Sequence, residues 1–163
     1  MSLNYSIPEK LDRDKAYTWI ASWFGCGFIN PAPGTWGSLG AIPFGIVLYM
    51  LGGSTLLVIA AAFITLLGLW AADRFDKAVD GHDSKMIVID EVAGQWLALI
   101  PAALNPYLII VAFVSFRFFD ILKPWPVSFF DKEIKGAVGV MGDDIVAGLY
   151  ACGVVILVDV LLF

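Results

Sequence analysis

Long segments without charge, separated by short polar ones, form the main pattern along the chain. Residues 37–72 contain no charged side chain, and these 36 positions exceed the roughly 20 residues that cross a bilayer once. The sequence Gly52-Gly53-Ser54 divides this segment, which predicts a short helix over residues 39–51 and a crossing helix over residues 55–72. Three further, largely apolar segments predict helices at residues 86–104, 107–122 and 145–163.

The N-terminal segment, residues 1–24, differs from the rest because it begins charged and ends apolar. Lys15, Trp19 and Trp23 recur every four residues, which is close to the period of a helix. Tryptophan is enriched where a membrane meets water. We therefore expect residues 8–24 to form an amphipathic helix that lies on the bilayer surface.

Composition places the chain in the membrane class. Hydrophobic residues make up 60% of the sequence and charged residues 15%, against about 25% charged residues in soluble domains. The sequence therefore predicts an all-α protein: a small polytopic membrane helix bundle with broken and short helices, in a single domain over residues 1–163. The net charge of −5 disfavours nucleic acid as a partner, because phosphate backbones select lysine and arginine.

The distribution of charge predicts how these helices are oriented. If the helices alternate in direction, the N-terminus and residues 73–91 and 117–144 lie on one side of the membrane. That side holds all 10 lysine and arginine residues and 14 of the 15 acidic residues. The positive-inside rule makes it the cytoplasmic side. Any chemistry carried by the acids is therefore expected at the cytoplasmic surface.

Two pairs of adjacent acids lie where apolar segments begin. Asp90 and Glu91 precede residues 92–116, which carry no charge, and Asp143 and Asp144 precede the last apolar segment. A buried carboxylate without a partner is costly, so acids in such places are expected to have a partner or a task. Capping of a helix N-terminus explains one acid of each pair, but it does not require both.

A divalent cation is a partner that fits both pairs. Clustered carboxylates repel one another unless a cation lies between them, and Mg²⁺ takes oxygen ligands. The glycine-rich residues 136–142 are expected to be a flexible approach that lets Asp143 and Asp144 come close to the first pair. Asp83 lies seven residues before Asp90, which puts both on one face if the helix is continuous.

Basic side chains near these acids suit an anionic substrate. Arg117, Asp120 and Lys123 are spaced three residues apart, on one face of the predicted helix. A helix ion pair with a snorkelling arginine explains this spacing, and so does a clamp for phosphate oxygens. The sequence Lys-Pro-Trp-Pro at residues 123–126 predicts the end of that helix, because proline cannot continue it.

A glycine-rich segment at residues 25–40 is expected not to form a regular helix. Thr35 and Ser38 are N-cap candidates for the helix that follows, and such a loop can offer hydroxyl and N–H groups to a phosphate. A plain turn that seats a membrane helix explains the segment equally well. His82, the single histidine, is expected to be exposed, although a proton donor to a leaving group would suit it.

Four blocks of the sequence resemble the phosphatidylglycerophosphatase A family, in the same order. They are Asn-Pro-Ala-Pro-Gly-Thr-Trp-Gly-Ser at 30–38, His-Asp at 82–83 with Ile-Val-Ile-Asp-Glu at 87–91, Phe-Arg-Phe-Phe-Asp-Ile-Leu-Lys-Pro-Trp-Pro at 116–126, and Gly-Val-Met-Gly-Asp-Asp-Ile-Val-Ala-Gly at 139–148. Members of that family are small bacterial membrane phosphatases that need Mg²⁺. They hydrolyse phosphatidylglycerophosphate to phosphatidylglycerol and inorganic phosphate.

The resemblance implies a role for each group of candidate residues. The acids that would bind Mg²⁺ and act in catalysis are Asp83, Asp90, Glu91, Asp143 and Asp144. The phosphate contacts would come from Arg117 and Lys123, with Thr35 and Ser38 added from the glycine-rich block. The protein would lie in the bacterial cytoplasmic membrane, with the acyl chains of its substrate in the lipid bilayer and its active site facing the cytoplasm.

Other classes of membrane protein fit part of this pattern. A divalent-cation transporter or another metal-binding membrane protein also carries acids in apolar segments. A transporter is expected to place some of them near the midplane, whereas here they lie at one end of the predicted helices. A CDP-alcohol phosphotransferase would share the acids, the metal and the lipid, but the sequence lacks its Asp-Gly…Ala-Arg…Gly…Asp…Asp run.

Overall fold

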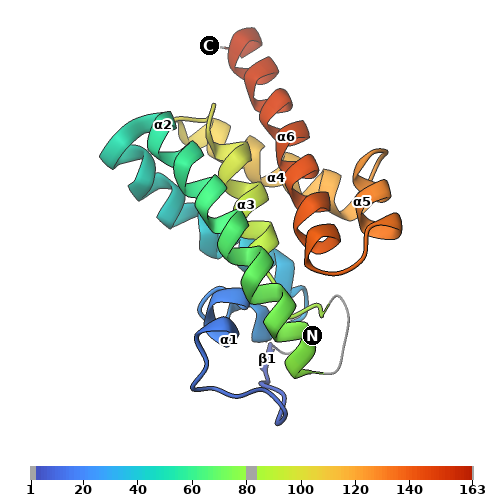
Figure 1. Ribbon diagram of the computed structural model, residues 1–163. Coiled ribbons are helices and arrows are strands. Elements are labelled where there is room, and N and C mark those ends of the chain that lie inside the picture. Colours follow the sequence, from blue (N-terminus) through green and yellow to red (C-terminus); the bar gives the residue numbers. More distant parts are fainter. Residues whose placement is uncertain (1–2, 80–83, 163) are drawn as a thin grey trace.

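A computed structural model of the chain describes residues 3–79 and 84–162 and shows an almost entirely helical protein (Figure 1). Its elements in chain order are β1 (Asn4–Tyr5), α1 (Ala16–Ala21), the 3-10 helix η1 (Cys26–Phe28), β2 (Ile29–Asn30), α2 (Pro33–Ala78), α3 (Ile89–Leu99), α4 (Pro106–Leu122), α5 (Val127–Glu133) and α6 (Ala137–Leu162). The two short strands pair antiparallel. The expected all-α fold is confirmed.

Helix α2 is a helical hairpin and not a straight rod. Gly52 and Gly53 have non-helical backbone angles, and Gly53 has a φ of +63°, which glycine adopts more easily than other residues. The chain runs to this kink and then turns back, as Figure 1 shows. The predicted division of residues 37–72 at these two glycines is confirmed, and the second arm continues as helix to Ala78.

The same helix begins earlier than the sequence predicts. Residues 25–40 are expected to avoid a regular helix, yet α2 starts at Pro33, whose fixed φ suits the first helical position. The N-cap residue is Ala32, so the prediction that Thr35 or Ser38 caps this helix is wrong. Three of the glycines there lie inside the helix. Gly34 allows close contact with Glu91 of α3 and Arg117 of α4, and Gly37 allows close contact with Val88, just before α3.

The N-terminal segment is helical only over Ala16–Ala21 and not over residues 8–24. Trp23, expected at the membrane surface, is 6% exposed, and its ring packs edge-on against Trp96 with 5.7 Å between centroids. Trp23 has a φ of +46°, so the chain turns there and directs the indole into the core. The interfacial placement of Trp23 is therefore wrong.

Helix α3 is shorter than the predicted segment 86–104. It covers 11 residues, and at about 1.5 Å per residue such a helix does not cross a bilayer. Residues 84–88 before it are not helical, so the continuous helix that would align Asp83 with Asp90 does not form. Asp83 itself lies outside the described residues.

The remaining helices agree with the prediction at one boundary and differ at another. Helix α4 ends at Leu122, before the Lys-Pro-Trp-Pro sequence, as predicted. Helix α6 begins at Ala137 and not at residue 145, so the prediction of a flexible approach over residues 136–142 is wrong. Close packing explains one glycine there: a Cβ on Gly139 would lie 1.9 Å from the carbonyl oxygen of Ile134.

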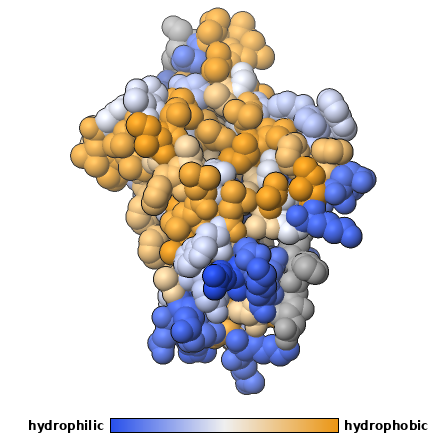
Figure 2. Space-filling view, in the orientation of Figure 1, coloured by the Kyte–Doolittle hydropathy of each residue, from blue (hydrophilic) through white to orange (hydrophobic). Residues whose placement is uncertain are grey.

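Hydrophobic side chains cover much of the outside of the bundle. Figure 2 shows them over the middle of the molecule, with hydrophilic residues gathered at the end where α1 and β1 lie. Among the described residues, α2 and α6 are the helices long and apolar enough to cross a membrane. Large apolar side chains such as Phe63, Leu66 and Leu157 are exposed.

Candidate active site

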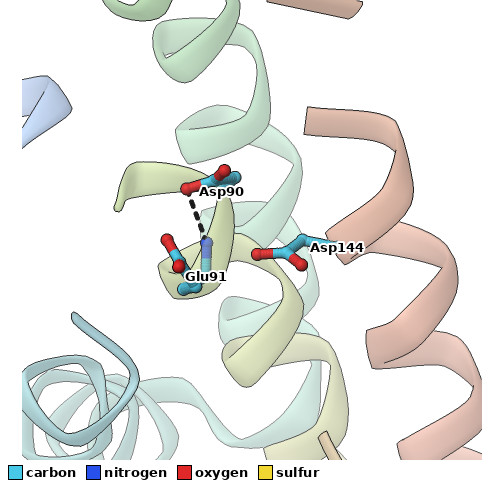
Figure 3. A group of neighbouring side chains, drawn as sticks. All are labelled: Asp90, Glu91 and Asp144. Carbon is cyan, nitrogen blue, oxygen red and sulfur yellow. Dashed lines mark hydrogen bonds between the residues drawn. The ribbon is translucent and has the colours of Figure 1, made fainter. Parts of the chain in front are cut away.

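Three carboxylates from two helices converge at the start of α3. Asp90 and Glu91 lie in the first turn of α3, and Asp144 lies about two turns into α6. One oxygen from each carboxylate lies within 4.8 Å of the others (Figure 3). The backbone N–H of Glu91 donates to Oδ1 of Asp90 at 3.0 Å, which orients that carboxylate. We call Asp90, Glu91 and Asp144 the acidic cluster.

Glycines allow the surrounding helices to approach closely enough to form this cluster. A Cβ on Gly94 would lie 2.5 Å from the backbone oxygen of Asp144, and a Cβ on Gly148 would lie 2.5 Å from that of Gly94. Real Cβ atoms do not make contacts this short, so a larger residue would separate α3 from α6. Gly34 has the same role in α2, where a Cβ would lie 2.0 Å from Oε1 of Glu91.

The cluster offers the ligands of a hard cation. Oε2 of Glu91 is buried and has no hydrogen-bond partner among the described residues. Carboxylates this close repel one another unless a cation lies between them, and divalent ions such as Mg²⁺ take oxygen ligands. Asp90, Glu91 and Asp144 therefore fit a divalent ion by their chemistry and by their spacing.

Asp143 lies beside the cluster but has a different partner. Lys123 Nζ donates to Oδ2 of Asp143 at 2.6 Å and also pairs with Asp131 of α5. Burial alone would lower the pKa of the Lys123 ammonium, but its bonds to the two carboxylates outweigh burial and raise that pKa above its ordinary value. The predicted helical alignment of Lys123 with Arg117 is wrong, because Lys123 follows the end of α4 with a φ of +45°.

Arg117 of α4 connects the cluster to the start of α2. Its Nη1 lies 2.5 Å from Oδ2 of Asp120 and 3.8 Å from Oε1 of Glu91. The same Nη1 donates to Oγ of Ser38 at 3.4 Å, and that hydroxyl donates to the carbonyl oxygen of Gly34 at 2.8 Å. The ion pair between Arg117 and Asp120, one of the two explanations of their spacing, is present, and Arg117 also helps to hold Glu91 in place.

These side chains line a cavity of about 850 Å³. The cavity brings together six of the predicted site residues, which are Asp90, Glu91, Arg117, Lys123, Asp143 and Asp144. Ser38 lies behind it, in contact with Arg117, whereas Thr35 in the first turn of α2 does not line it. Asp83 and His82 lie outside the described residues.

Asp131 is a residue of this site that the sequence does not single out. It lies in α5, and only the fold brings it to the ammonium of Lys123. The close packing at Gly94 and Gly148 is not predicted from the sequence either. One signal was present, because Gly94 and Ala98 lie four residues apart, a spacing of small residues that is typical of closely packed membrane helices.

Comparison with known sequences gives consistent matches. The sequence profile described as "Phosphatidylglycerophosphatase A" matches residues 19–159. A protein of that name from Haemophilus influenzae strain Rd is 43% identical over 138 residues, covering 83% of this chain and 84% of its own length. A protein of the same name from Escherichia coli strain K12 is 35% identical over 147 residues, covering 90% of this chain and 85% of its own length.

A third relative carries a different name. The "Putative phosphatidylinositol-3-phosphatase" of Bacteroides thetaiotaomicron is 40% identical over 139 residues, covering 81% of this chain and 86% of its own length. No solved structure matches the chain. Because the profile match and the alignments with the first two relatives extend over most of its length, the chain belongs to the phosphatidylglycerophosphatase A family of phosphatases.

Proposed function

We propose that this enzyme hydrolyses the terminal phosphate monoester of phosphatidylglycerophosphate, giving phosphatidylglycerol and inorganic phosphate. The reaction would use Mg²⁺ and take place at the cytoplasmic face of a bacterial inner membrane. The observation that carries the proposal is the convergence of Asp90, Glu91 and Asp144 in a cavity that Arg117 also lines. Two relatives that bear the name of this activity support the choice of substrate.

The donor set supports Mg²⁺ as the cofactor. The acidic cluster supplies carboxylate oxygens from Asp90, Glu91 and Asp144, and Oε2 of Glu91 has no partner in the described part of the chain. When bound, Mg²⁺ would supply a Lewis acid that polarises phosphate oxygens and lowers the pKa of a bound water. Asp143 would remain beside these ligands, held by its bond to Lys123.

Arg117 would bind a phosphate while it keeps its acidic partners. Its Nη1 is engaged by Asp120, Glu91 and Ser38, whereas its Nε has no partner among the described residues. A guanidinium has five N–H donors, so donors remain for phosphate oxygens. Fixed donors of this kind stabilise the charge that develops on a phosphate in the transition state.

The outer surface supports a membrane location. Helices α2 and α6 are long and apolar enough to cross a bilayer, and large hydrophobic side chains are exposed around the bundle. The acyl chains of the substrate would stay in the bilayer while the head group enters the cavity. The positive-inside rule supports a cytoplasmic position for the charged end.

A phosphoinositide is the second candidate substrate, because the relative from Bacteroides thetaiotaomicron carries that substrate class in its name. Both lipids present a phosphate monoester on a head group, so the same residues would act on either.

A divalent-cation transporter fits less well. The acidic cluster lies at the first turn of α3, in a cavity that it shares with the end of α4.

Phosphate release by the purified protein in neutral detergent tests the proposal, with Mg²⁺ and with excess chelator. Release from phosphatidylglycerophosphate should disappear with chelator and return with Mg²⁺. Glu91→Gln should lower kcat/KM by about 10²–10³-fold. Glu133→Gln is the matched control, because Glu133 is exposed and does not line the cavity. Release from phosphatidylinositol 3-phosphate alone would favour the second candidate, and release from neither lipid would overturn the proposal.

A further inference from the structure

The cations that line the cavity fall into two groups. Arg117 and Lys123 are each held by two carboxylates. Lys85, Lys132 and Lys135 line the same cavity, yet none of them forms an ion pair within residues 3–79 and 84–162. The charge of the first group is already balanced by the protein, whereas the charge of the second group is available to a ligand.

The second group lies at the exposed end of the cavity. Lys132 is in the last turn of α5, and Lys135 is in the connection from α5 to α6; both side chains are exposed. The acids Asp143 and Asp144 further along the chain are only 6% and 2% exposed. The cavity therefore has a buried acidic part, which fits a metal ion, and an exposed part with three ammonium groups that form no ion pair within the described residues. Two of them, those of Lys132 and Lys135, come from the same segment at the end of α5.

We infer that Lys132 and Lys135 bind a second anionic group of the substrate, the phosphodiester of its head group, which is not cleaved. The inference rests on the proposed function, because phosphatidylglycerophosphate carries a phosphodiester one glycerol unit away from its terminal monoester. In this lipid the phosphodiester lies between the monoester and the acyl chains. With the monoester at the acidic cluster and the acyl chains outside the cavity, the phosphodiester lies in the exposed part of the cavity. Lysine suits this position because its ammonium is a compact point charge on a flexible stem.

The two lysines are therefore specificity-determining residues and not catalytic ones. They would favour a lipid with two phosphates over one whose single phosphate is the monoester. A general attraction of lysines to an anionic membrane surface is the competing explanation. Lys77 provides the control for it, because this exposed lysine at the end of α2 pairs with Asp73 and does not line this cavity.

Kinetics of the full-length enzyme with Mg²⁺ in neutral detergent micelles tests the inference. The variant Lys132→Gln/Lys135→Gln should raise KM for phosphatidylglycerophosphate by about tenfold or more, as expected for lost hydrogen bonds to a charged group. Its kcat should stay at the wild-type value, which also shows that the variant is folded. Lys77→Gln should change neither KM nor kcat.

Two product inhibitors separate the parts of the cavity. Phosphatidylglycerol keeps the phosphodiester and lacks the monoester, so its competitive inhibition should weaken in the double variant by about the factor seen in KM. Inhibition by inorganic phosphate, which probes the acidic cluster, should not change. A failure of phosphatidylglycerol to inhibit the wild-type enzyme would count against the inference.

The outcomes also separate this inference from the proposed function. Normal turnover by the wild type with an unchanged KM in the double variant would overturn the assignment of Lys132 and Lys135 alone. An increase in KM that appears only when anionic lipid is added to the micelles would overturn it in favour of surface attraction. No turnover of phosphatidylglycerophosphate by the wild type would overturn the proposed function, and this inference with it.

Discussion

The two pairs of adjacent acids look alike in sequence and differ in structure. In both pairs the backbone N–H of the second acid donates to Oδ1 of the first at 3.0 Å. Asp90 and Glu91 both belong to the acidic cluster, whereas from the other pair only Asp144 does. Asp143 is instead bound by Lys123 at 2.6 Å. One pair supplies two candidate ligands and the other supplies one.

The difference follows from where each pair lies in its helix. Asp90 and Glu91 lie in the first turn of α3, where a helix N-terminus favours negative charge. Asp143 and Asp144 lie inside α6, where adjacent side chains point in directions about 100° apart. One of them faces α3 and the other faces the lysine after α4. The neighbours of each acid, and not the presence of a pair, therefore determine its role.

Among the variants of the two acidic pairs, Asp144→Asn should lower the activity most. It removes a charge from the acidic cluster, so kcat/KM should fall by about 10²–10³-fold. The Mg²⁺ concentration needed for half-maximal activity should rise at the same time. Steady-state kinetics over a Mg²⁺ titration measures both quantities. Wild-type activity at ordinary Mg²⁺ concentrations would show that the cluster is not the metal site.

The variant Gly94→Ala should disturb the cluster by geometry and not by charge. Its Cβ would lie 2.4 Å from Cε2 of Phe116 and 2.5 Å from the backbone oxygen of Asp144. Overpacking of this kind costs about 1–3 kcal/mol of stability. A shift of about 1 Å in the cluster would lower the rate by about 10²-fold. Thermal unfolding in detergent and kcat are the measurements.

Gly153→Ala is the matched control for that variant. Gly153 also lies in a helix, α6, but a Cβ there meets nothing within 4 Å. Alanine forms helix better than glycine, so this variant should be neutral or stabilised by about 0.5–1 kcal/mol. Equal losses from the two variants would contradict the conclusion that Gly94 sets the approach of α3 to α6.

Local chemistry explains what could be predicted from the sequence. The kink at Gly52 and Gly53 and the end of α4 before Lys123 follow from the backbone preferences of glycine and proline. The gathering of acids and cations in one cavity follows from charge patterning, since the charged segments were expected at the same end of the bundle. These features depend on neighbours in the chain.

Features that depend on packing were not predictable in the same way. Glycines such as Gly34 and Gly139 are typical of loops, but in this chain they lie in helices whose neighbours leave no room for a Cβ. Tryptophan is typical of the membrane interface, but Trp23 is packed against Trp96 in the core. Whether Asp143 or Asp144 joins the acidic cluster depends on how α6 is rotated against α3, which no local sequence pattern determines.

Among the variants of the two acidic pairs, Asp143→Asn should have the smallest effect, a loss of about tenfold in kcat/KM, because it changes a neighbour of the acidic cluster and leaves Lys123 bound to Asp131. Asp131→Asn is its matched variant, since it removes the other acid of the same lysine. The two losses should be similar, and neither should shift the Mg²⁺ titration as Asp144→Asn does. A loss from Asp143→Asn as large as that from Asp144→Asn would mean that both pairs contribute two ligands, so the lysine would no longer distinguish them.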